Sequence, residues 1–338
     1  MISTDTLEER LSRPSQALID DLAELDGDIM ILGAGGKMGP SLARMAARAG
    51  RDSGIKRTIR AVSRWSDEAA AEDLAADGVE IVRADLEKPA DLAELEPAQN
   101  VVFMVGRKFG TEAQPWQTWW TNAYLPAAVA ERFPGSRFAV FSTGNVYPLL
   151  PVLGGGPTTT TPPAPVGEYG QAALARERMF ERAAEIHGTK VSILRLNYAI
   201  ELRYGVLVDI GRAILDGRPV DISAGLVNVC WQGWANSVAL RSLRHAESPP
   251  TLLNLTGPET ASVEWIAREL AERMERPVQL TGAPGDTALL NNAARTHAEF
   301  GYPDVTLGEM LDMTAEWLIG GGALLDKPTH FEVRTGRF

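Results

Sequence analysis

The sequence predicts an α/β fold, in which a doubly wound parallel sheet is accompanied by a smaller mixed α/β lobe. Three observations support this fold class. The apolar run 29–32 leads into three glycines, and an alanine-rich segment with helical periodicity follows them. Strand-like and helix-like segments then alternate as far as residue 196, which is typical of a sheet whose strands run parallel. Beyond residue 200 the alternation loosens, which indicates a second, smaller unit.

The glycines of the first segment, Gly33, Gly36 and Gly39, are spaced three residues apart between the expected strand and the expected helix. Glycine has no Cβ, so such a turn lets backbone N–H groups and the positive end of a helix dipole approach a pyrophosphate. We therefore expect a Rossmann-type dinucleotide site here, with Lys37 and Met38 of the turn in contact with the cofactor. The alternative is a tight strand-to-helix turn that binds no ligand.

The remaining elements follow from hydrophobic periodicity and from breaks at glycine and proline. Leucines near helical spacing predict a single N-terminal helix over 7–25. Further strands are expected at 57–63, 79–84, 100–105, 137–142, 190–196 and 252–255, and helices over 67–76, 91–95, 116–132, 169–187, 263–274 and 307–318. The segment 149–166 is rich in Pro, Gly and Thr, so we expect an ordered active-site loop or a flexible lid there.

These elements divide the chain into an N-terminal helical extension, 1–26, a dinucleotide-binding domain, 27–200, and a smaller substrate-binding lobe, 201–330. A strand near 251–256 is expected to return to the sheet of the dinucleotide-binding domain. The smaller lobe would close over the carboxyl ends of the strands, where ligands bind in folds of this kind.

Composition and charge limit the classes of protein that fit this chain of 338 residues. One cysteine, Cys230, excludes an internal disulfide and a cysteine-based zinc site, and the four histidines are scattered, so we expect no metal site. A formal net charge of −11 argues against binding to nucleic acid or to a membrane surface. No apolar run approaches the length of a membrane span, and the polar, acidic start differs from a secretory signal, so we expect a cytoplasmic protein.

Further motifs follow the glycine turn in a set order: Asp85-Leu86, then Asn122, then Phe141-Ser-Thr-Gly-Asn-Val-Tyr147, then Tyr169, and finally Arg195-Leu196-Asn197. With the glycines, they resemble the extended short-chain dehydrogenase/reductase group, also called the NAD-dependent epimerase/dehydratase family, over about residues 28–320. The resemblance implies that Asp85 and Leu86 hold the adenine and that Asn122 is the family's helix asparagine. It also implies that Thr143 and Tyr169 take the positions of the catalytic hydroxyl and the catalytic tyrosine.

The sequence departs from this family at Ala173, where a lysine would follow the tyrosine by four residues. In the family that lysine binds the nicotinamide ribose and favours the ionised tyrosine, and alanine can do neither. Lys108 lies in a loop that, with Val105 and Gly106, borders the nicotinamide in the family, so it is the best candidate to supply the missing charge. The alternative is a solvated basic turn. Arg176, seven residues and two turns beyond the tyrosine, is a weaker candidate than Lys108 to reach the same proton.

The end of the second strand bears on the choice of cofactor. An acidic residue there would accept hydrogen bonds from a ribose 2′-hydroxyl and favour NAD, but Ser63 and Arg64 occupy this end. An arginine pairs with a 2′-phosphate or stacks on the adenine, so we favour NADP over NAD. The alternative is that Arg64 merely begins a surface loop.

Three tryptophans, Trp116, Trp119 and Trp120, share one face of the long helix because they lie at positions i, i+3 and i+4. Such stripes more often belong to a core or a subunit interface, and the resemblance implies that helices 116–132 and 169–187 pair across a homodimer. The functional interpretation is a wall in which Trp116 stacks on a sugar ring.

Together these features favour an NAD(P)-dependent oxidoreductase or epimerase/dehydratase-like enzyme acting on a hydroxyl or keto carbon of a sugar or sugar-acid derivative. Thr143 would hydrogen-bond the reacting oxygen, Tyr169 would orient or protonate it, and Lys108 would supply charge. Asn145 and Asn197, both within the motifs, are further candidates for binding this small-molecule substrate. The alternative is a non-catalytic NADP-binding redox sensor that acts through a protein partner.

Overall fold

A seven-stranded sheet forms the centre of the structure, in the order β12-β7-β5-β4-β1-β2-β3. The computed structural model describes residues 2–110 and 113–337. The strands are β1 Ile29–Leu32, β2 Ile59–Ser63, β3 Glu80–Arg83, β4 Asn100–Phe103, β5 Arg137–Thr143, β7 Lys190–Leu196 and β12 Thr251–Leu255. Each expected strand is present to within two residues at either end. All neighbouring pairs run parallel, which confirms the predicted fold class.

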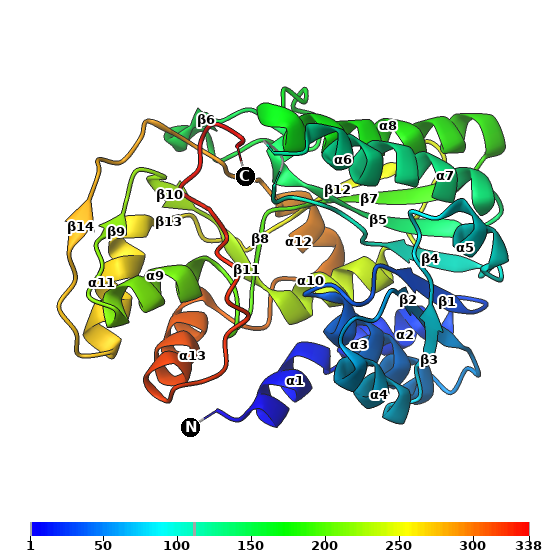
Figure 1. The fold of residues 1–338 in the computed structure, drawn as a ribbon, viewed down its shortest axis with the longest axis horizontal. Coiled ribbons are helices and arrows are strands. Elements are labelled where there is room, and N and C mark those ends of the chain that lie inside the picture. Colours follow the sequence, from blue (N-terminus) through cyan, green and yellow to red (C-terminus); the bar gives the residue numbers. More distant parts are fainter. Residues whose placement is uncertain (1, 111–112, 338) are drawn as a thin grey trace.

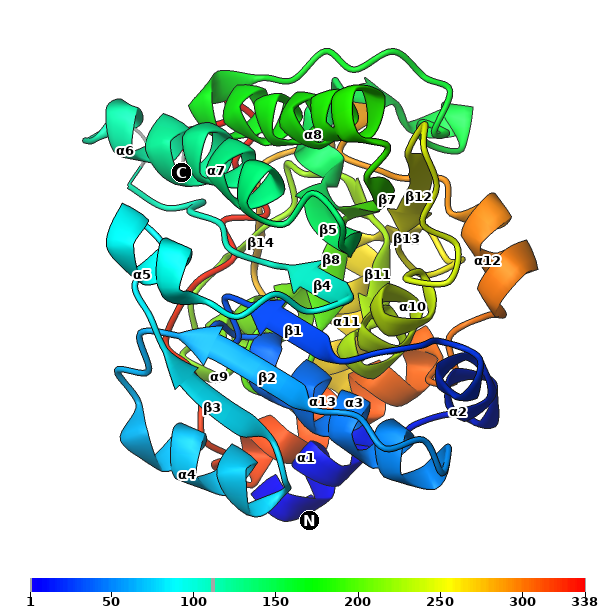
Figure 2. The ribbon, with the colours of Figure 1, turned by 90° about the vertical axis from the view of Figure 1, so that its right-hand side faces the viewer.

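Helices cover both faces of this sheet (Figures 1 and 2). Side chains alternate along β1, so that Ile29 and Ile31 enter one core and Met30 and Leu32 enter the other. The first core is closed by α2 Gln16–Ala23, α3 Gly39–Asp52, α4 Glu68–Ala76 and α10 Gln232–Arg241, and the second by α5 Pro89–Glu94, α7 Leu125–Arg132 and α8 Gly167–His187. The strand order reverses between β1 and β4, which opens a crevice at the carboxyl ends of these strands.

The expectation of one N-terminal helix over 7–25 is wrong, because the chain forms two helices, α1 Thr4–Ser12 and then α2. Pro14 has no N–H to donate, and it keeps Arg13 in an extended conformation. Ser15 then caps α2 by accepting a hydrogen bond from the Leu18 N–H. The two helices pack in different cores, because the leucines of α1 join the second lobe while those of α2 join the sheet.

The expected single helix over 116–132 is interrupted. It consists of α6 Pro115–Trp119, a π-helical turn over Trp120–Tyr124, and α7. A π-turn inserts an extra residue per turn and often occurs at functional sites. Here it carries Asn122, whose side chain is fully buried toward the loop that follows β4.

The second lobe has its own hydrophobic core beside the carboxyl ends of the strands, on the left of Figure 1. It contains α9 Val206–Leu215, α11 Val263–Arg273 and α13 Leu307–Ile319, with the short strand pairs β8 Tyr198–Ile200/β11 Val229–Trp231, β9 Val220–Asp221/β14 Leu280–Thr281 and β10 Leu226–Val227/β13 Ala261–Ser262. The sequence did not predict α9, in which seven of the ten residues are buried, because a short apolar run such as 206–208 fits a strand as well as a helix. It also missed α10 and α12 Ala294–Phe300.

Two irregular segments frame the junction between the sheet and this lobe. In the segment 149–166, Leu150–Pro151 forms the short strand β6, which pairs with β15 Thr287–Ala288. The residues after α13 run back along the junction toward the start of α8, shown in red in Figure 1.

Candidate functional site

The glycine turn packs so closely that side chains are excluded at two of its three glycines. Gly33 has a φ of +91°, and a Cβ there would lie 2.9 Å from the Val105 side chain. A Cβ on Gly39 would collide with the Ala34 carbonyl oxygen. Gly36 is exposed, and a Cβ there would meet only the Gly33 oxygen at 3.3 Å. The turn is therefore tight on its protein side and open at the N-terminus of α3, as a pyrophosphate requires.

The other residues that were expected to bind the adenosine half of the cofactor lie at the ends of β2 and β3. Ser63 ends β2 against the turn, because a Cβ on Gly35 would lie 2.5 Å from its Oγ. Arg64 is exposed, and Trp65 adopts a left-handed φ of +50° and buries its ring. Asp85 and Leu86 follow β3 after one intervening residue, Ala84; Leu86 is buried, and the Asp85 carboxylate accepts a hydrogen bond from the Glu87 N–H. No carboxylate is thus found at the end of β2, while one lies at the end of β3.

At the other side of the turn, Asn122 clamps the loop after β4. Its Oδ1 accepts a hydrogen bond from the Arg107 N–H at 3.0 Å, and its Nδ2 donates to the Arg107 carbonyl at 2.7 Å. Gly106 lies against this clamp, since a Cβ there would be 3.4 Å from the same Oδ1. This asparagine therefore fixes the segment that was expected to border the nicotinamide.

Arg176 is the residue that the sequence analysis ranked below Lys108 as a source of the missing charge. Its buried guanidinium donates to Asn122 Oδ1 at 2.5 Å and to the Phe141 carbonyl at 2.6 Å, and a Cβ on Gly106 would lie 3.0 Å from it. Burial lowers the pKa of Arg176 and the Tyr169 phenol opposes that shift, so the two groups are within electrostatic reach. Helical side chains point toward the helix N-terminus, and a long arginine therefore reaches back by more than a turn.

Ala173 lies on the same face of α8 as Tyr169 and Arg176, and its small side chain leaves room for the Arg176 guanidinium. Residues 169, 173 and 176 follow at i, i+4 and i+7, and Ala173 is buried against Val146 and Tyr147. The Nε of Arg176 is buried and has no hydrogen-bond partner among the described residues. A buried cation with an unused donor beside Gly106 fits a site for an oxygen-rich ligand.

Thr143 and Tyr169 are held relative to one another by the turn that follows β5. The Thr143 hydroxyl oxygen accepts from the Asn145 N–H at 3.2 Å and from its Nδ2 at 3.1 Å, which leaves the hydroxyl hydrogen to be donated. Tyr169 lies in the first turn of α8, and a Cβ on the neighbouring Gly170 would be 2.6 Å from the Asn145 carbonyl. Asn145 thus supports both residues.

A group of three asparagines lies next to this turn, beside Gly144. The Asn197 amide donates to Asn228 Oδ1 at 2.6 Å, and Asn228 donates to the Asn291 carbonyl at 2.6 Å. Asn291 Oδ1 is buried without a partner among the described residues, and a Cβ on Gly144 would lie 2.9 Å from it. Asn197 was expected here, whereas Asn291 gave no sequence signal because it belongs to the irregular connection between β15 and α12.

Lys108 is not the solvated turn residue that was considered as an alternative. It is partly buried, its ammonium donates to the Thr329 carbonyl at 2.9 Å, and burial lowers its pKa to about 8. Lys37, in the glycine turn, has its ammonium 3.2 Å from the centre of the Tyr204 ring. Met38 is half-buried at the start of α3.

Trp116, by contrast, is 65% exposed on α6. Trp119 donates from its Nε1 to Glu168 at the start of α8. A sugar-stacking role for Trp116 therefore stays a prediction.

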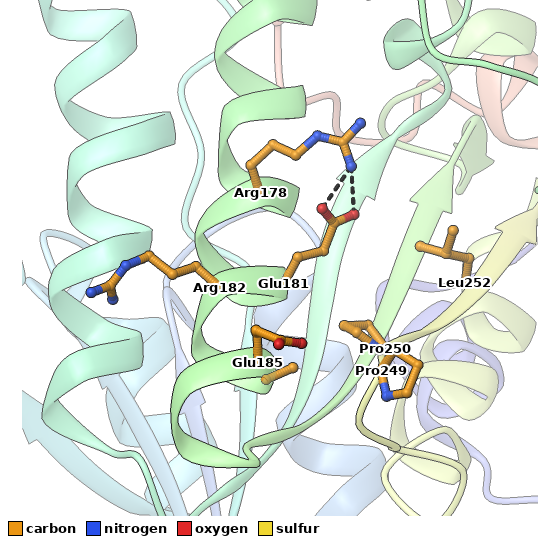
Figure 3. A pocket seen from close by; sticks show the side chains of 8 residues that line it. Arg178, Glu181, Arg182, Glu185, Pro249, Pro250 and Leu252 are labelled. Atoms are coloured by element: carbon orange, nitrogen blue, oxygen red, sulfur yellow. Dashed lines mark hydrogen bonds and ion pairs between the residues drawn. The ribbon is translucent and has the colours of Figure 1, made fainter.

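A surface hollow of about 480 Å³ lies away from these residues, between α8 and the segment before β12 (Figure 3). Its rim carries the exposed pair Arg178–Glu181 and the prolines Pro249 and Pro250. Because β12 begins directly after these prolines, the hollow is near the amino ends of the strands, opposite the glycine turn. None of the predicted site residues lines it.

None of the helices in residues 2–110 and 113–337 combines the length and the apolar character that crossing a bilayer requires. Within the same ranges, no group of three or more His, Cys, Asp or Glu residues is arranged to hold a metal ion.

Solved structures with the same fold include three sugar epimerases. UDP-glucuronic acid 4-epimerase from Bacillus cereus, solved in complex with NAD, matches with a TM-score of 0.74 and 17% identity over 88% of this chain and 99% of its own. The UDP-Glc/GlcNAc 4-epimerase from Campylobacter jejuni matches with a TM-score of 0.72 and 18% identity over 86% and 99%. UDP-glucose 4-epimerase from Thermus thermophilus, solved with NAD, gives 0.68 and 17% over 86% and 98%.

At the level of sequence, no curated protein matches the chain. The family model described as "NAD dependent epimerase/dehydratase family" matches residues 29–200, which is more than half of the chain. This match covers the glycine turn, Thr143, Tyr169 and Asn197, and it confirms the expectation of an epimerase/dehydratase-type enzyme. The chain therefore belongs to the NAD-dependent epimerase/dehydratase family.

Proposed function

We propose that this protein binds a nicotinamide dinucleotide and acts on the hydroxyl-bearing carbon of a nucleotide sugar, with epimerisation as the favoured outcome. The observation that carries the proposal is the glycine turn, whose open side lies at the same sheet edge as Thr143 and Tyr169. Membership of the epimerase/dehydratase family supports it, as do neighbours that are named UDP-sugar epimerases.

The site residues have separate tasks in this chemistry. Thr143 donates its free hydroxyl hydrogen to the reacting oxygen, because both lone pairs of its oxygen are engaged by Asn145. Tyr169 exchanges the proton of that oxygen, and Arg176 stabilises the negative charge that develops on the phenol as the proton leaves. When bound, the nicotinamide would accept a hydride from the sugar carbon and return it.

Residues of the glycine turn and of the neighbouring strand ends would hold the dinucleotide. Gly33, Gly36, Met38 and Gly39 would receive the pyrophosphate, and Asp85 and Leu86 the adenine. Val105, Gly106 and Asn122 would border the nicotinamide. The absence of a carboxylate at the end of β2 favours NADP over NAD as the finer proposal, with Ser63 and Arg64 at the 2′-phosphate.

Replacing Arg64 by alanine is expected to weaken NADP binding about tenfold to a hundredfold and to leave NAD binding within about twofold, because only NADP carries the 2′-phosphate. Calorimetric titration of both dinucleotides into the two proteins measures this. Arg178→Ala, which removes an exposed arginine near the opposite edge of the sheet, is the matched control. NAD binding that is tighter than NADP binding, or an unchanged NADP affinity in the variant, would contradict the role of Arg64.

The proposed activity is tested by incubating the protein with UDP-sugars and each dinucleotide, and by following epimer formation by NMR. Tyr169→Phe should lower turnover about a hundredfold or more while cofactor affinity is retained. If dinucleotides bind and no sugar is converted, the catalytic proposal fails, and the redox-sensor alternative becomes the better account of the missing lysine.

We also propose a homodimer formed through α6 and its neighbours. Trp120 and Tyr124 stack with ring centres 4.2 Å apart, and they are 40% and 47% exposed. Exposed aromatic groups of this size are typical of protein interfaces. Trp120→Glu should shift the protein from dimer to monomer in light scattering, whereas Trp265→Glu, which changes an equally exposed tryptophan of α11, should not. A wild-type monomer would refute the interface.

A further inference from the structure

The last described residues, 325–337, form no helix or strand and cross the junction between the second lobe and the sheet; we call them the C-terminal strap. In Figure 1 they are the red segment that follows α13 and runs toward the start of α8. Thr329 and Gly336 are the only two buried residues of the strap. Its position therefore depends on a few contacts, which lie on both sides of the junction.

On the side of the second lobe, the strap is bonded to α9 and to the loop before it. The Leu325 N–H donates to the Arg203 carbonyl at 3.1 Å. Thr329 donates from its N–H and from its hydroxyl to the Asp209 carboxylate, at 2.7 and 2.6 Å. Asp209 lies in the first turn of α9, so these bonds fix residues 325–329 to the second lobe.

On the side of the sheet, the middle of the strap contacts the loop after β4. The Thr329 carbonyl accepts a hydrogen bond from the Lys108 ammonium at 2.9 Å. The next residue, His330, packs its ring on Phe109 with ring centres 5.7 Å apart. His330 also has a left-handed φ of +54°, which is unfavourable for most residues that carry a side chain. The chain therefore turns sharply, with some strain, where it leaves the second lobe.

The end of the strap packs against the start of α8 through two glycines. Gly336 and Gly167 have left-handed φ angles of +72° and +76°. A Cβ on Gly336 would collide with the Val166 carbonyl oxygen, and a Cβ on Gly167 would collide with the Gly336 carbonyl oxygen. We call this contact the latch. Gly167 precedes Tyr169 by two residues, so the latch lies beside the tyrosine to which we assign the proton transfer.

A further contact joins the strap to the segment 149–166, which the sequence predicted to be an active-site loop or a lid. Arg334 donates from its guanidinium to the Thr287 carbonyl at 2.6 Å and also to the Thr287 hydroxyl. Thr287 belongs to β15 and pairs with Pro151 of β6, within that segment. The strap is therefore connected to the predicted loop through β15.

We propose that the strap is a lid over the approach to Tyr169, and that the latch has to open before a substrate can enter or a product can leave. The proposal rests on the proposed function for the identity of that substrate, a nucleotide sugar. Opening moves residues 330–337, while the bonds to Arg203 and Asp209 keep residues 325–329 on the second lobe. Segments with few buried contacts and no regular hydrogen bonding open at low free energy, and such lids set the rate of entry and release in many enzymes.

One pair of glycine variants isolates the latch. Gly336→Ala is expected to open it, because the added Cβ collides with the Val166 carbonyl oxygen. Gly321→Ala is the matched control, since Gly321 has a similar φ of +68° but nothing lies within 4 Å of an added Cβ. Both alanines carry the same backbone strain, so only the collision distinguishes them. Arg334→Met, which removes the two bonds to Thr287, loosens the same part of the strap by another route.

Two measurements on the full-length protein without any ligand report the opening. Hydrogen–deuterium exchange over 330–337 reports whether the strap leaves its contacts. Nitration of Tyr169 by tetranitromethane, followed by peptide mass mapping, reports whether the phenol ring becomes accessible. Gly336→Ala should raise both rates about tenfold, and Gly321→Ala should leave both within about twofold. Tyr302, which is 70% exposed, is the internal standard and should be nitrated at the same rate in all of these proteins.

Stopped-flow tryptophan fluorescence then compares the association of UDP-glucose with the same proteins, and Gly336→Ala should raise its rate constant several-fold. If strap exchange is faster but Tyr169 nitration or UDP-glucose association keeps its wild-type rate, the lid proposal is overturned and the proposed function stands. Unchanged strap exchange in both Gly336→Ala and Arg334→Met, or equal acceleration in Gly321→Ala, would also overturn it. If Tyr169 is nitrated faster in Gly336→Ala but no UDP-sugar or dinucleotide binds, the lid stands and the proposed function fails.

Discussion

Replacing Glu177 by leucine is expected to lower the free energy of unfolding by about 3–5 kcal/mol, because it leaves the buried Arg195 guanidinium without its counter-ion. Glu177 is fully buried and accepts hydrogen bonds from Arg195 Nε at 3.0 Å and from its terminal nitrogen at 2.6 Å. It also accepts the Ser142 hydroxyl at 2.5 Å. The loss should be measured by urea denaturation followed by circular dichroism.

The same helix provides a matched control. Glu181, one turn further along α8, pairs with Arg178 at the surface, with side chains 32% and 50% exposed (Figure 3). Glu181→Leu should change stability by less than about 1 kcal/mol, since exposed ion pairs contribute little. In Glu177→Leu/Arg195→Met, much of the lost stability should return, because no unpaired buried charge remains. Equal losses in the Glu177 and Glu181 variants would refute the assigned importance of the buried pair.

This pair also shows how the fold supports the site. Arg195 donates to the Tyr147 hydroxyl at 2.8 Å, and Tyr147 donates to Asn254 of β12 at 2.9 Å. The network joins α8, β7, β12 and the turn after β5, and Thr143 ends β5 while Asn145 lies in that turn. Partial loosening in the Glu177 variant should therefore disturb the site before the sheet itself unfolds.

Local sequence signals were sufficient for the sheet. Each strand is a short apolar run bounded by a turn, and the alternation with helices leaves few parallel arrangements open. These signals failed where tertiary packing decides the position or the boundaries of a helix. The leucines of residues 7–25 hid the break at Pro14, since their spacing continues across it. The helix α9 was missed because its short apolar run 206–208 fits a strand as well as a helix.

For the site, the motifs predicted which strand ends would matter but not the contacts across the chain. Lys108 was singled out from its loop, yet its partner Thr329 lies 221 residues away, in a segment with no recognisable motif. Arg176 was judged by its spacing along the helix. That criterion ignores the length of an arginine side chain and its direction toward the helix N-terminus.

Replacing Arg176 by methionine is expected to lower kcat for the proposed reaction about a hundredfold, with KM changed by no more than about threefold. Methionine retains the apolar stem and removes the buried charge that interacts electrostatically with the Tyr169 phenol. Loss of a positively charged neighbour lowers the rate by about this factor where negative charge develops away from water. Steady-state kinetics with the wild-type protein and the variant measure both constants.

The missing family lysine supplies the decisive comparison. Ala173→Lys added to Arg176→Met should recover about tenfold of the lost kcat, since it returns a cation to the same helical face as Tyr169. A role in catalysis also predicts that Tyr169→Phe/Arg176→Met is hardly slower than Tyr169→Phe alone, because the charge acts through the phenol. Fully additive losses would instead mean that Arg176 only supports the clamp formed by Asn122. In that case Lys108 remains the candidate for the missing charge, and Lys108→Met should then reproduce the kinetic loss.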